Sequence, residues 1–305
     1  MLSHRQAWSF GLALFVFSFV FFTASADDAP TATYHTGAFE VRVTFFATDQ
    51  NNHPVETIGK DDFAIVDGET VVRDFRSLTR TSETALDVVA VVDSSESVAP
   101  RFRRTMNDVL QLAPQEQFET EDGFSVLSYS GLRPILLCSR DCRTPAARQR
   151  LLAAQAGGPT PLFDTLAYAA DFISASRKPG VRQIVILFSD GNDNVSINSA
   201  REALHALLAS GALLYAVDLN EPQASESSAF LERMAEATGG RSFSVQDGAA
   251  RVLQSALADL RASYVVTCPL PNRMAGFHSL RILPKHNLNL RFHCRRGYYY
   301  EENHR

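Results

Sequence analysis

The chain has 305 residues, 45% of them hydrophobic and 21% charged, and a formal net charge of −5. Hydrophobic residues are numerous enough for a real core, and the length suggests one large or two modest domains. The net charge is negative and no block of Lys and Arg alternates with aromatic residues, which argues against nucleic-acid binding.

Residues 1–26 are typical of a secretory signal peptide. His4 and Arg5 give a weakly positive start, residues 8–22 form an apolar run, and Ala24-Ser25-Ala26 has the small side chains of a cleavage site. We expect cleavage after Ala26, which leaves an exported protein without a membrane span, in the periplasm, secreted or on the cell surface. The alternative is an uncleaved N-terminal membrane anchor, because the uncharged stretch is just long enough to cross a bilayer.

Residues 32–80 have the character of an all-β segment. Residues 39–47, 63–66 and 71–75 are rich in β-forming residues, and Asp67-Gly68 is typical of a hairpin turn. No helical periodicity appears in this segment, so we expect only strands here.

Residues 84–262 alternate between strand and helix patterns. The stretches 88–92 and 183–188 are apolar throughout, as in the central strands of a parallel sheet that is buried on both faces. Alternating strands and helices predict an α/β fold with a doubly wound, mostly parallel sheet and helices on both faces. Strands are expected at 88–92, 124–129, 132–137, 183–188, 212–217 and 242–245, and helices at 102–113, 162–175, 200–209, 230–237 and 249–262.

Residues 263–301 return to strand character, at 264–267, 279–283, 288–293 and 298–300. We expect these strands to pack with residues 32–80 in one small all-β domain, because each segment alone would be a marginal sheet. The α/β domain would then be an insertion in a discontinuous β domain. The alternative is two separate β appendages.

The chain has four cysteines, and an even number in an exported protein suggests disulfides, with three pairings to choose from. We favour Cys138–Cys142, which are neighbours in one loop, and Cys268–Cys294, which would join two segments of strand character. Zinc is the alternative, held with His278, His286 or His293, but no CxxC or HxxxH pair supports it.

Oxygen-bearing side chains follow the central strands of the predicted sheet. Asp93, Ser95 and Ser97 come directly after the first buried strand, Asp190 follows the second, and Thr160 precedes a helix. Ligands of open parallel sheets bind at the carboxyl ends of the strands, so we expect these loops to meet. Two carboxylates and three hydroxyls suit Mg²⁺, with Mn²⁺ as a second candidate, and the lack of His or thiolate argues against zinc and copper. Because the hydroxyls are neutral, an acidic group of a partner is expected to complete the coordination.

These motifs resemble those of a known family. DSSES at 93–97, Thr160 in TPLFD and Asp190 in SDG resemble the metal-ion-dependent adhesion site of von Willebrand factor type A domains. DFAIVDGETVVRDF at 62–75, TGGRSF at 238–243 and RRGYYY at 295–300 extend the resemblance to bacterial exported proteins called VWFA-related. The chain departs from that pattern at Cys268 and Cys294 and at Pro159, which stands between a Gly pair and Thr160.

The resemblance implies a Rossmann-like fold and a binding module for a protein or matrix ligand that presents Asp or Glu. It also implies that Asp93, Ser95 and Ser97 contact the metal directly, while Thr160 and Asp190 contact it directly or through water. In the family, the type A domain is flanked by the same N- and C-terminal β segments, which agrees with the insertion.

Some of these residues also have a simpler, purely structural explanation. Asp93 and Ser95 are good helix caps, and Asp164 is expected to bond backbone N–H groups near a helix start. We expect a solvated turn at Asp193 and Asn194, although Asn194-Val195-Ser196 also matches a glycosylation sequon. Glu96 is expected to face solvent, and Tyr298–Tyr300 to pack as a strand.

Two other functions compete with a binding module. A Mg²⁺-dependent phosphohydrolase could use Asp93 as a nucleophile, but Ser95 stands where such enzymes of the haloacid dehalogenase type need a second Asp, and no Lys is placed to hold a phosphate. The other alternative is a scaffold whose metal only stabilises its own loops. We therefore expect a protein that is not an enzyme.

Overall fold

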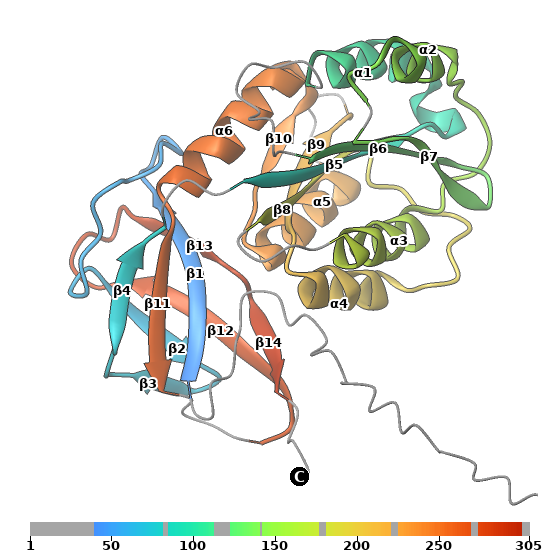
Figure 1. Ribbon diagram of the computed structural model, residues 1–305. Helices are drawn as coiled ribbons and strands as arrows, with labels where there is room; N and C mark the ends of the chain where they lie inside the picture. The colour runs from blue at the N-terminus through green and yellow to red at the C-terminus, as the bar shows by residue number, and fades with distance from the viewer. Residues whose placement is uncertain are drawn as a thin grey trace, which may run out of the picture.

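The computed structural model describes residues 40–81, 85–112, 123–140, 142–176, 181–220, 225–269 and 274–300. The signal peptide expected at residues 1–26 lies outside them. Within the described residues, none of the helices has the length and apolar character needed to cross a membrane. The structure confirms the predicted fold class: an α/β part with one central sheet, beside a smaller part made of two β-sheets (Figure 1).

The central sheet has six strands in the order β10-β9-β8-β5-β6-β7. Its strands pair in parallel from β10 to β6, and β7 alone pairs antiparallel, with β6. All eight residues of β5 are buried, and the apolar run 88–92 at its centre predicts burial on both faces. The strands are β5 (Leu86–Asp93), β6 (Gly123–Ser130), β7 (Arg133–Ser139), β8 (Arg182–Ser189), β9 (Leu213–Asp218) and β10 (Ser242–Ser244).

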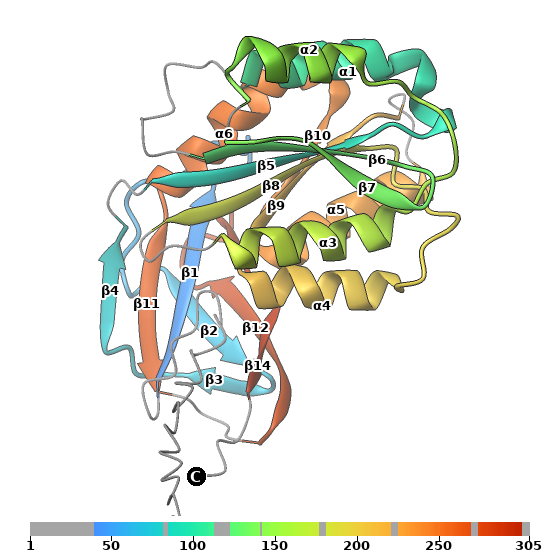
Figure 2. The same ribbon diagram turned by 45° about the vertical axis from the view of Figure 1, so that its right-hand side comes forward.

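Helices cover both faces of this sheet (Figure 2). One face carries α1 (Ala99–Leu112), α2 (Pro145–Ala153) and α6 (Ala249–Arg261), and the other carries α3 (Leu162–Ala175), α4 (Ala200–Ser210) and α5 (Glu226–Thr238). Two short 3₁₀ helices, η1 (Glu96–Val98) and η2 (Val245–Asp247), follow β5 and β10. The sequence did not predict α2, which buries only Ala147 and Leu151 and so shows little apolar periodicity.

The β part consists of two four-stranded sheets, ordered β13-β1-β11-β4 and β14-β12-β2-β3. Each sheet contains strands from before and after the α/β part, so the expected joint β domain is present and two separate appendages are wrong. The two sheets share one core that includes Phe45, Phe63, Val266 and Ile282. The strands are β1 (Glu40–Thr48), β2 (Phe63–Asp67), β3 (Thr70–Val72), β4 (Ser77–Arg80), β11 (Tyr264–Pro269), β12 (Gly276–Pro284), β13 (Arg291–Cys294) and β14 (Gly297–Tyr300).

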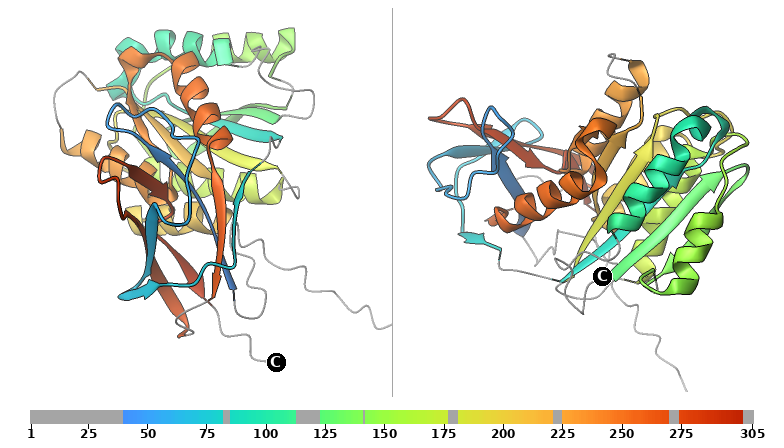
Figure 3. Two further views of the ribbon diagram at one scale, coloured as in Figure 1. Left: turned by 90° about the vertical axis from the view of Figure 1, so that its left-hand side faces the viewer. Right: turned by 90° about the horizontal axis from the view of Figure 1, so that it is seen from above.

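The two parts meet along α6, which lies between the β-sheets and the other helices of its face (Figure 3). The chain enters the α/β part after β4 and leaves it through α6 into β11. At this point the backbone N–H and the hydroxyl of Thr81 both donate to the carbonyl of Ser263, each at 2.9 Å. The entry and the exit of the α/β part therefore lie side by side.

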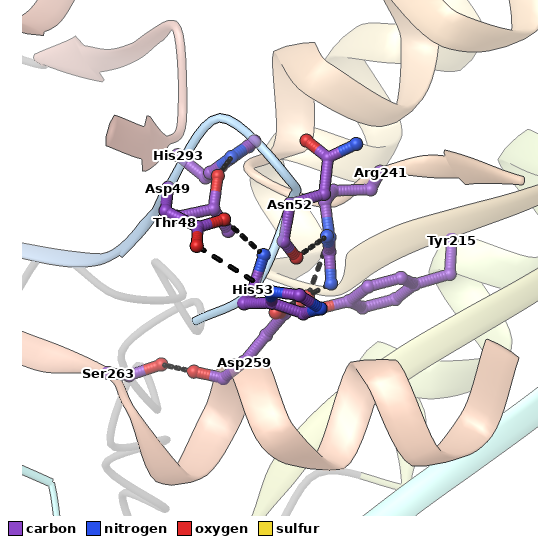
Figure 4. Close-up of polar contacts among 9 residues, drawn as sticks. All are labelled: Thr48, Asp49, Asn52, His53, Tyr215, Arg241, Asp259, Ser263 and His293. Atoms are coloured by element: carbon purple, nitrogen blue, oxygen red, sulfur yellow. Dashed lines mark hydrogen bonds and ion pairs between the residues drawn. The ribbon is translucent and has the colours of Figure 1, made fainter. Parts of the chain in front are cut away.

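A buried polar cluster also joins the two parts (Figure 4). Arg241 donates to both carboxylate oxygens of Asp259, from Nε at 3.0 Å and from Nη2 at 2.8 Å. Its Nη1 donates to the carbonyl of Asn52, in the loop after β1, at 3.0 Å. Tyr215 of β9 donates to Asp259 at 3.1 Å. The cluster thus ties α6 to the central sheet and to the β domain.

The cysteine predictions have different outcomes. Cys138 and Cys142 form the expected disulfide, with their Cα atoms 5.2 Å apart. Cys268 and Cys294 are both free, so the second expected disulfide is wrong. They lie on β11 and β13, on opposite sides of β1, where Cys268 pairs with Val41 and Cys294 with Phe45. Neighbouring strands are about 4.8 Å apart, so two strand spacings already exceed the roughly 7 Å limit for a disulfide.

Candidate metal centre

Three loops meet at the carboxyl ends of β5 and β8. The backbone N–H of Glu96 donates to the carbonyl of Gly158 at 3.0 Å, which joins the loop after β5 to the loop before α3. The N–H of Asn194 donates to the carbonyl of Thr160, also at 3.0 Å, which joins that second loop to the one after β8. The structure therefore brings together the three segments that carry Asp93, Ser95, Ser97, Thr160 and Asp190.

Asp93 is fully buried at the end of β5. Its Oδ1 accepts the N–H of Ser95 at 2.9 Å, and its Oδ2 accepts the hydroxyls of Tyr129 at 3.0 Å and Ser189 at 3.2 Å. Burial raises the pKa of Asp93 above its ordinary value, and the negative charge of Asp190 raises it further. Hydrogen bonds from Ser95 and Tyr129 oppose this rise of the pKa, and a cation beside the carboxylate would oppose it more strongly.

The two serines mark the boundary between the buried site and solvent. Ser95 is fully buried, Ser97 is exposed, and their Oγ atoms lie 3.1 Å apart. Ser95 immediately precedes η1, but its side chain makes no capping hydrogen bond, so a purely capping role for Ser95 is wrong. Glu96 between them is exposed, as expected.

Thr160 and Asp190 complete the set of oxygen-bearing side chains. Thr160 is 2% exposed and Asp190 is 4% exposed. The amide oxygen of Asn194 accepts the N–H of Thr160 at 2.8 Å, and the carbonyl of Pro159 accepts the N–H of Gly131 at 2.9 Å. Hydrogen bonds from the two neighbouring loops therefore hold the backbone at Pro159 and Thr160 in place.

Four supporting residues were not recognised in the sequence: Tyr129, Ser189, Asp193 and Asn194. The carboxylate of Asp193 accepts the N–H of Phe163, in the first turn of α3, at 3.1 Å, and also the hydroxyl of Ser196. Asn194 is exposed and Asp193 is half-buried, in keeping with the solvated turn expected here, and their side chains also hold the loop against the segment that begins α3. Tyr129 carries no recognisable signal, since it reads as an ordinary strand residue in FSVLSYS.

The predicted structural role of Asp164 is confirmed. Its carboxylate accepts the backbone N–H groups of Ile197, at 3.0 and 3.1 Å, and Asn198, at 2.8 Å, and these bonds lower its pKa although partial burial opposes them. Asp164 thereby fixes the far end of the loop that begins at Asp190.

The residues present fit a hard divalent cation better than a soft one. Two buried carboxylates and three hydroxyls are oxygen donors, the type that Mg²⁺ and Mn²⁺ prefer. No group of three or more His, Cys, Asp or Glu side chains that could hold a metal occurs in the described part of the chain. The zinc alternative therefore gains no support there.

Comparison with known proteins gives a family and several similar structures. Residues 87–259 match the family model of the von Willebrand factor type A domain. No curated protein matches the chain.

Similar solved structures come from several organisms. Proximal thread matrix protein 1 of the mussel byssus is 17% identical, with a TM-score of 0.46, over 59% of this chain and 49% of that one, so this chain spans about half of it. A von Willebrand factor type A protein from Catenulispora acidiphila is 12% identical, with a TM-score of 0.46, over 88% of this chain and 76% of that one. The vWF domain of the type V pili tip protein Mfa5 from Porphyromonas gingivalis is 13% identical, with a TM-score of 0.42, over 58% of this chain and 95% of that one.

Proposed function

Because this chain belongs to the von Willebrand factor type A domain family, we propose that it is an exported, non-enzymatic binding module. In this proposal a Mg²⁺ ion, held by Asp93, Ser95, Ser97, Thr160 and Asp190, binds an acidic group of a protein or matrix partner. The observation that supports the proposal is the contact between three loops, which together carry two buried carboxylates and three hydroxyls.

The charges of the site support this function. Asp93 and Asp190 together balance a divalent ion, while the three hydroxyls add no charge. The ion, when bound, supplies electrostatic attraction for an incoming carboxylate. Tyr129 and Ser189 orient Asp93, and Asn194 positions the backbone at Thr160. These residues hold the donors in place before a partner arrives.

The geometry also weighs against the phosphohydrolase. A nucleophilic carboxylate needs a free oxygen directed at the substrate. Asp93 is fully buried, and both of its oxygens already accept hydrogen bonds from Ser95, Tyr129 and Ser189. Oδ1 accepts only one hydrogen bond from the described residues and keeps a lone pair for a small cation, while the full burial of Asp93 weighs against the approach of a bulkier phosphoryl group.

A calorimetric titration of Mg²⁺ and Mn²⁺ into the mature protein tests the metal site. The test variant is Asp93→Asn and the matched control is Asp87→Asn, since Asp87 is a buried carboxylate at the opposite end of the same strand. We expect one saturable site in the wild type and in Asp87→Asn, and none in Asp93→Asn. Equal metal binding by all three proteins would exclude the proposed ligand set.

A second experiment separates a binding module from a scaffold with a purely structural metal. With Mn²⁺ bound, the relaxation rate of water protons reports whether water reaches the ion. Acetate serves as the carboxylate probe. A fall in the relaxation rate on adding acetate, absent in Asp93→Asn at the same Mn²⁺ concentration, is expected for a module whose ion is open to a partner. A stable metal complex that acetate leaves unchanged would favour the scaffold.

A further inference from the structure

Two large apolar side chains are strongly exposed beside the candidate metal centre. Ile197, in the loop after β8, is 95% exposed, and Leu132, in the turn between β6 and β7, is 80% exposed. They are the two most exposed large apolar side chains of the described residues. Figure 2 shows the turn and the loop at the same end of the central sheet. That end, where the parallel strands terminate, is also where ligands of such sheets bind.

The turn that carries Leu132 is fixed to two of the three loops of the site. The N–H of Gly131, the preceding residue, donates to the carbonyl of Pro159 in the loop before α3 at 2.9 Å. At the end of β6, the carbonyl of Tyr129 accepts both the N–H and the hydroxyl of Ser94, in the loop after β5, each at 3.0 Å. These hydrogen bonds hold the backbone at Leu132 in a defined position beside the site.

Ile197 lies in the third loop of the site, which is fixed to the start of α3. Its N–H donates to both carboxylate oxygens of Asp164, at 3.0 and 3.1 Å, and the N–H of Asn198 donates to the same carboxylate at 2.8 Å. Asp164 lies in the first turn of α3. Earlier in this loop, the N–H of Asn194 donates to the carbonyl of Thr160 at 3.0 Å. The backbone around Ile197 is thus bound at two points to the segment that begins α3.

The two apolar side chains follow strands on opposite sides of the strand that carries Asp93. In the central sheet β5 lies between β6 and β8, and Leu132 follows β6 while Ile197 follows β8. An acidic residue bound at the end of β5 would thus lie between a turn that presents Leu132 and a loop that presents Ile197. Single exposed apolar residues are common on protein surfaces, and the position beside the site is what distinguishes these two.

Both side chains can gain apolar contacts at little cost. Their backbones are already held by the hydrogen bonds described above, so binding a partner fixes only side-chain rotamers. Covering the two side chains with apolar groups removes apolar area from water, which favours binding. A polar segment would gain little from these contacts and would lose hydration of its own polar groups. The surroundings of the site therefore favour a partner with apolar residues next to its acidic residue.

We propose that the metal centre selects an acidic residue with apolar residues on both sides in the partner's sequence, and that Leu132 and Ile197 contact these apolar residues. This selection rests on the proposed function, because the bound ion places the acidic residue. It adds the class of partner, an extended protein segment of the pattern apolar–acidic–apolar. Neither side chain carries an oxygen, so both contact the partner and leave the coordination of the ion unchanged.

Fluorescence anisotropy in saturating Mg²⁺ tests this selection with two labelled peptides that have blocked termini, Gly-Leu-Glu-Leu-Gly and Gly-Ser-Glu-Ser-Gly. The test variant is Leu132→Ser/Ile197→Ser, and its matched control is Val71→Ser/Leu288→Ser, at exposed apolar positions of the β domain. In the wild type and the control we expect the Leu peptide to bind at least about tenfold more tightly than the Ser peptide. In the test variant we expect equal affinities, with the Ser peptide bound as in the wild type. Calorimetric Mg²⁺ titrations should be the same for all three proteins.

Failure of this selection and failure of the proposed function give different results. Equal affinity of the wild type for both peptides, lost in chelator, would overturn the selection and leave the proposed function intact. Peptide binding that persists in chelator and in Asp93→Asn would overturn the selection, since the ion would not place the acidic residue. Binding of neither peptide by the Mg²⁺-loaded wild type would overturn both.

Two other results would overturn the role of Leu132 and Ile197. A preference for the Leu peptide that the test variant retains would assign the apolar contacts to other residues. Mg²⁺-dependent binding of phosphatidylglycerol vesicles that the test variant loses, with no preference between the peptides, would assign the two side chains to a membrane.

Discussion

At the scale of single residues, Tyr129 is expected to control metal affinity without touching the ion. Tyr129→Phe removes the hydroxyl that donates to Oδ2 of Asp93. Loss of such an orienting partner typically lowers metal affinity by about 10- to 100-fold. Tyr215→Phe is the matched control, since Tyr215 is equally buried and donates to another buried carboxylate, Asp259.

Calorimetric Mg²⁺ titrations of the two Tyr variants measure this effect. Tyr129→Phe removes the hydroxyl that contacts Asp93 and Ser189, and Tyr215→Phe removes the one that contacts Asp259, so both variants are expected to be less stable by about 1–3 kcal/mol. Only Tyr129→Phe should also bind Mg²⁺ more weakly. A similar affinity in both variants would show that Asp93 holds its position without Tyr129.

His293 is expected to make stability depend on pH. Burial, together with the positive charges of Arg241 and Arg291, lowers the pKa of His293 from 6.5 to about 4. The folded protein keeps His293 neutral while the unfolded chain protonates it below pH 6.5, so its contribution is complete above pH 6.5 and is lost as the pH falls toward 4. The loss amounts to at most about 3 kcal/mol.

Urea unfolding of the wild type and His293→Gln across this pH range measures the histidine contribution. Gln keeps a polar group for Thr48, whose hydroxyl lies 3.0 Å from Nε2 of His293. In the difference in unfolding free energy between the two proteins, the pH-dependent contributions of all other titrating groups cancel. It should shrink steadily as the pH falls, and a constant difference would rule out His293 as the cause.

At the scale of elements, the turns that support the site tolerate side chains to different degrees. Gly191 and Gly131 have similar positive φ angles, 77° and 73°. A Cβ on Gly191 would lie 2.6 Å from the carbonyl oxygen of Ser227 on α5, whereas a Cβ on Gly131 would meet no atom within 4 Å. Gly131→Ala is expected to cost about 1–2 kcal/mol from backbone strain, and Gly191→Ala about 1–3 kcal/mol more from the clash. Equal costs in urea unfolding would mean that α5 moves aside freely.

Elements with a strong sequence pattern were predicted, and pairings that depend on register were not. The apolar strands β5 and β8 and the strand–helix alternation specify the sheet, because burial on both faces leaves few alternatives. No local sequence pattern predicts the order of the strands in the β domain. Without it, β1 could not be placed between Cys268 and Cys294, and the disulfide was wrongly expected.

In the site, too, residues beside a recognisable strand could be predicted, and residues that act through long-range contacts could not. Asp93, Ser95 and Ser97 follow a recognisable strand, so their position at the edge of the sheet could be predicted. Tyr129 and Asn194 act through partners more than thirty residues away, at Asp93 and Thr160. Such contacts exist only in the folded chain, which is why sequence reasoning missed these residues.

At the scale of the whole molecule, the cluster around Arg241 is expected to hold the two parts together. Arg241→Gln would leave Asp259 buried and without its cation, which typically costs about 3–5 kcal/mol. The matched control is Arg251→Gln on α6, since the Arg251–Asp247 pair is exposed and worth no more than about 1 kcal/mol.

Hydrogen exchange then localises the effect of Arg241→Gln. Arg241 donates to the carbonyl of Asn52, so the loop after β1 should lose protection in this variant and keep it in Arg251→Gln. Unfolding free energies of the two variants provide the second measurement. Similar values for both would mean that the cluster contributes no more than a surface ion pair.

The adjacent entry and exit of the α/β part bear on the order of folding. Strands β4 and β11 are antiparallel neighbours, and the chain leaves one at Thr81 and returns to the other at Ser263. The entire inserted domain thus occupies the position of a hairpin loop. An unfolded loop of roughly 180 residues costs about 3 kcal/mol more to close than a loop of four. A folded insert already holds its two ends one hydrogen bond apart. We therefore expect β4 and β11 to pair only after the inserted α/β part has folded.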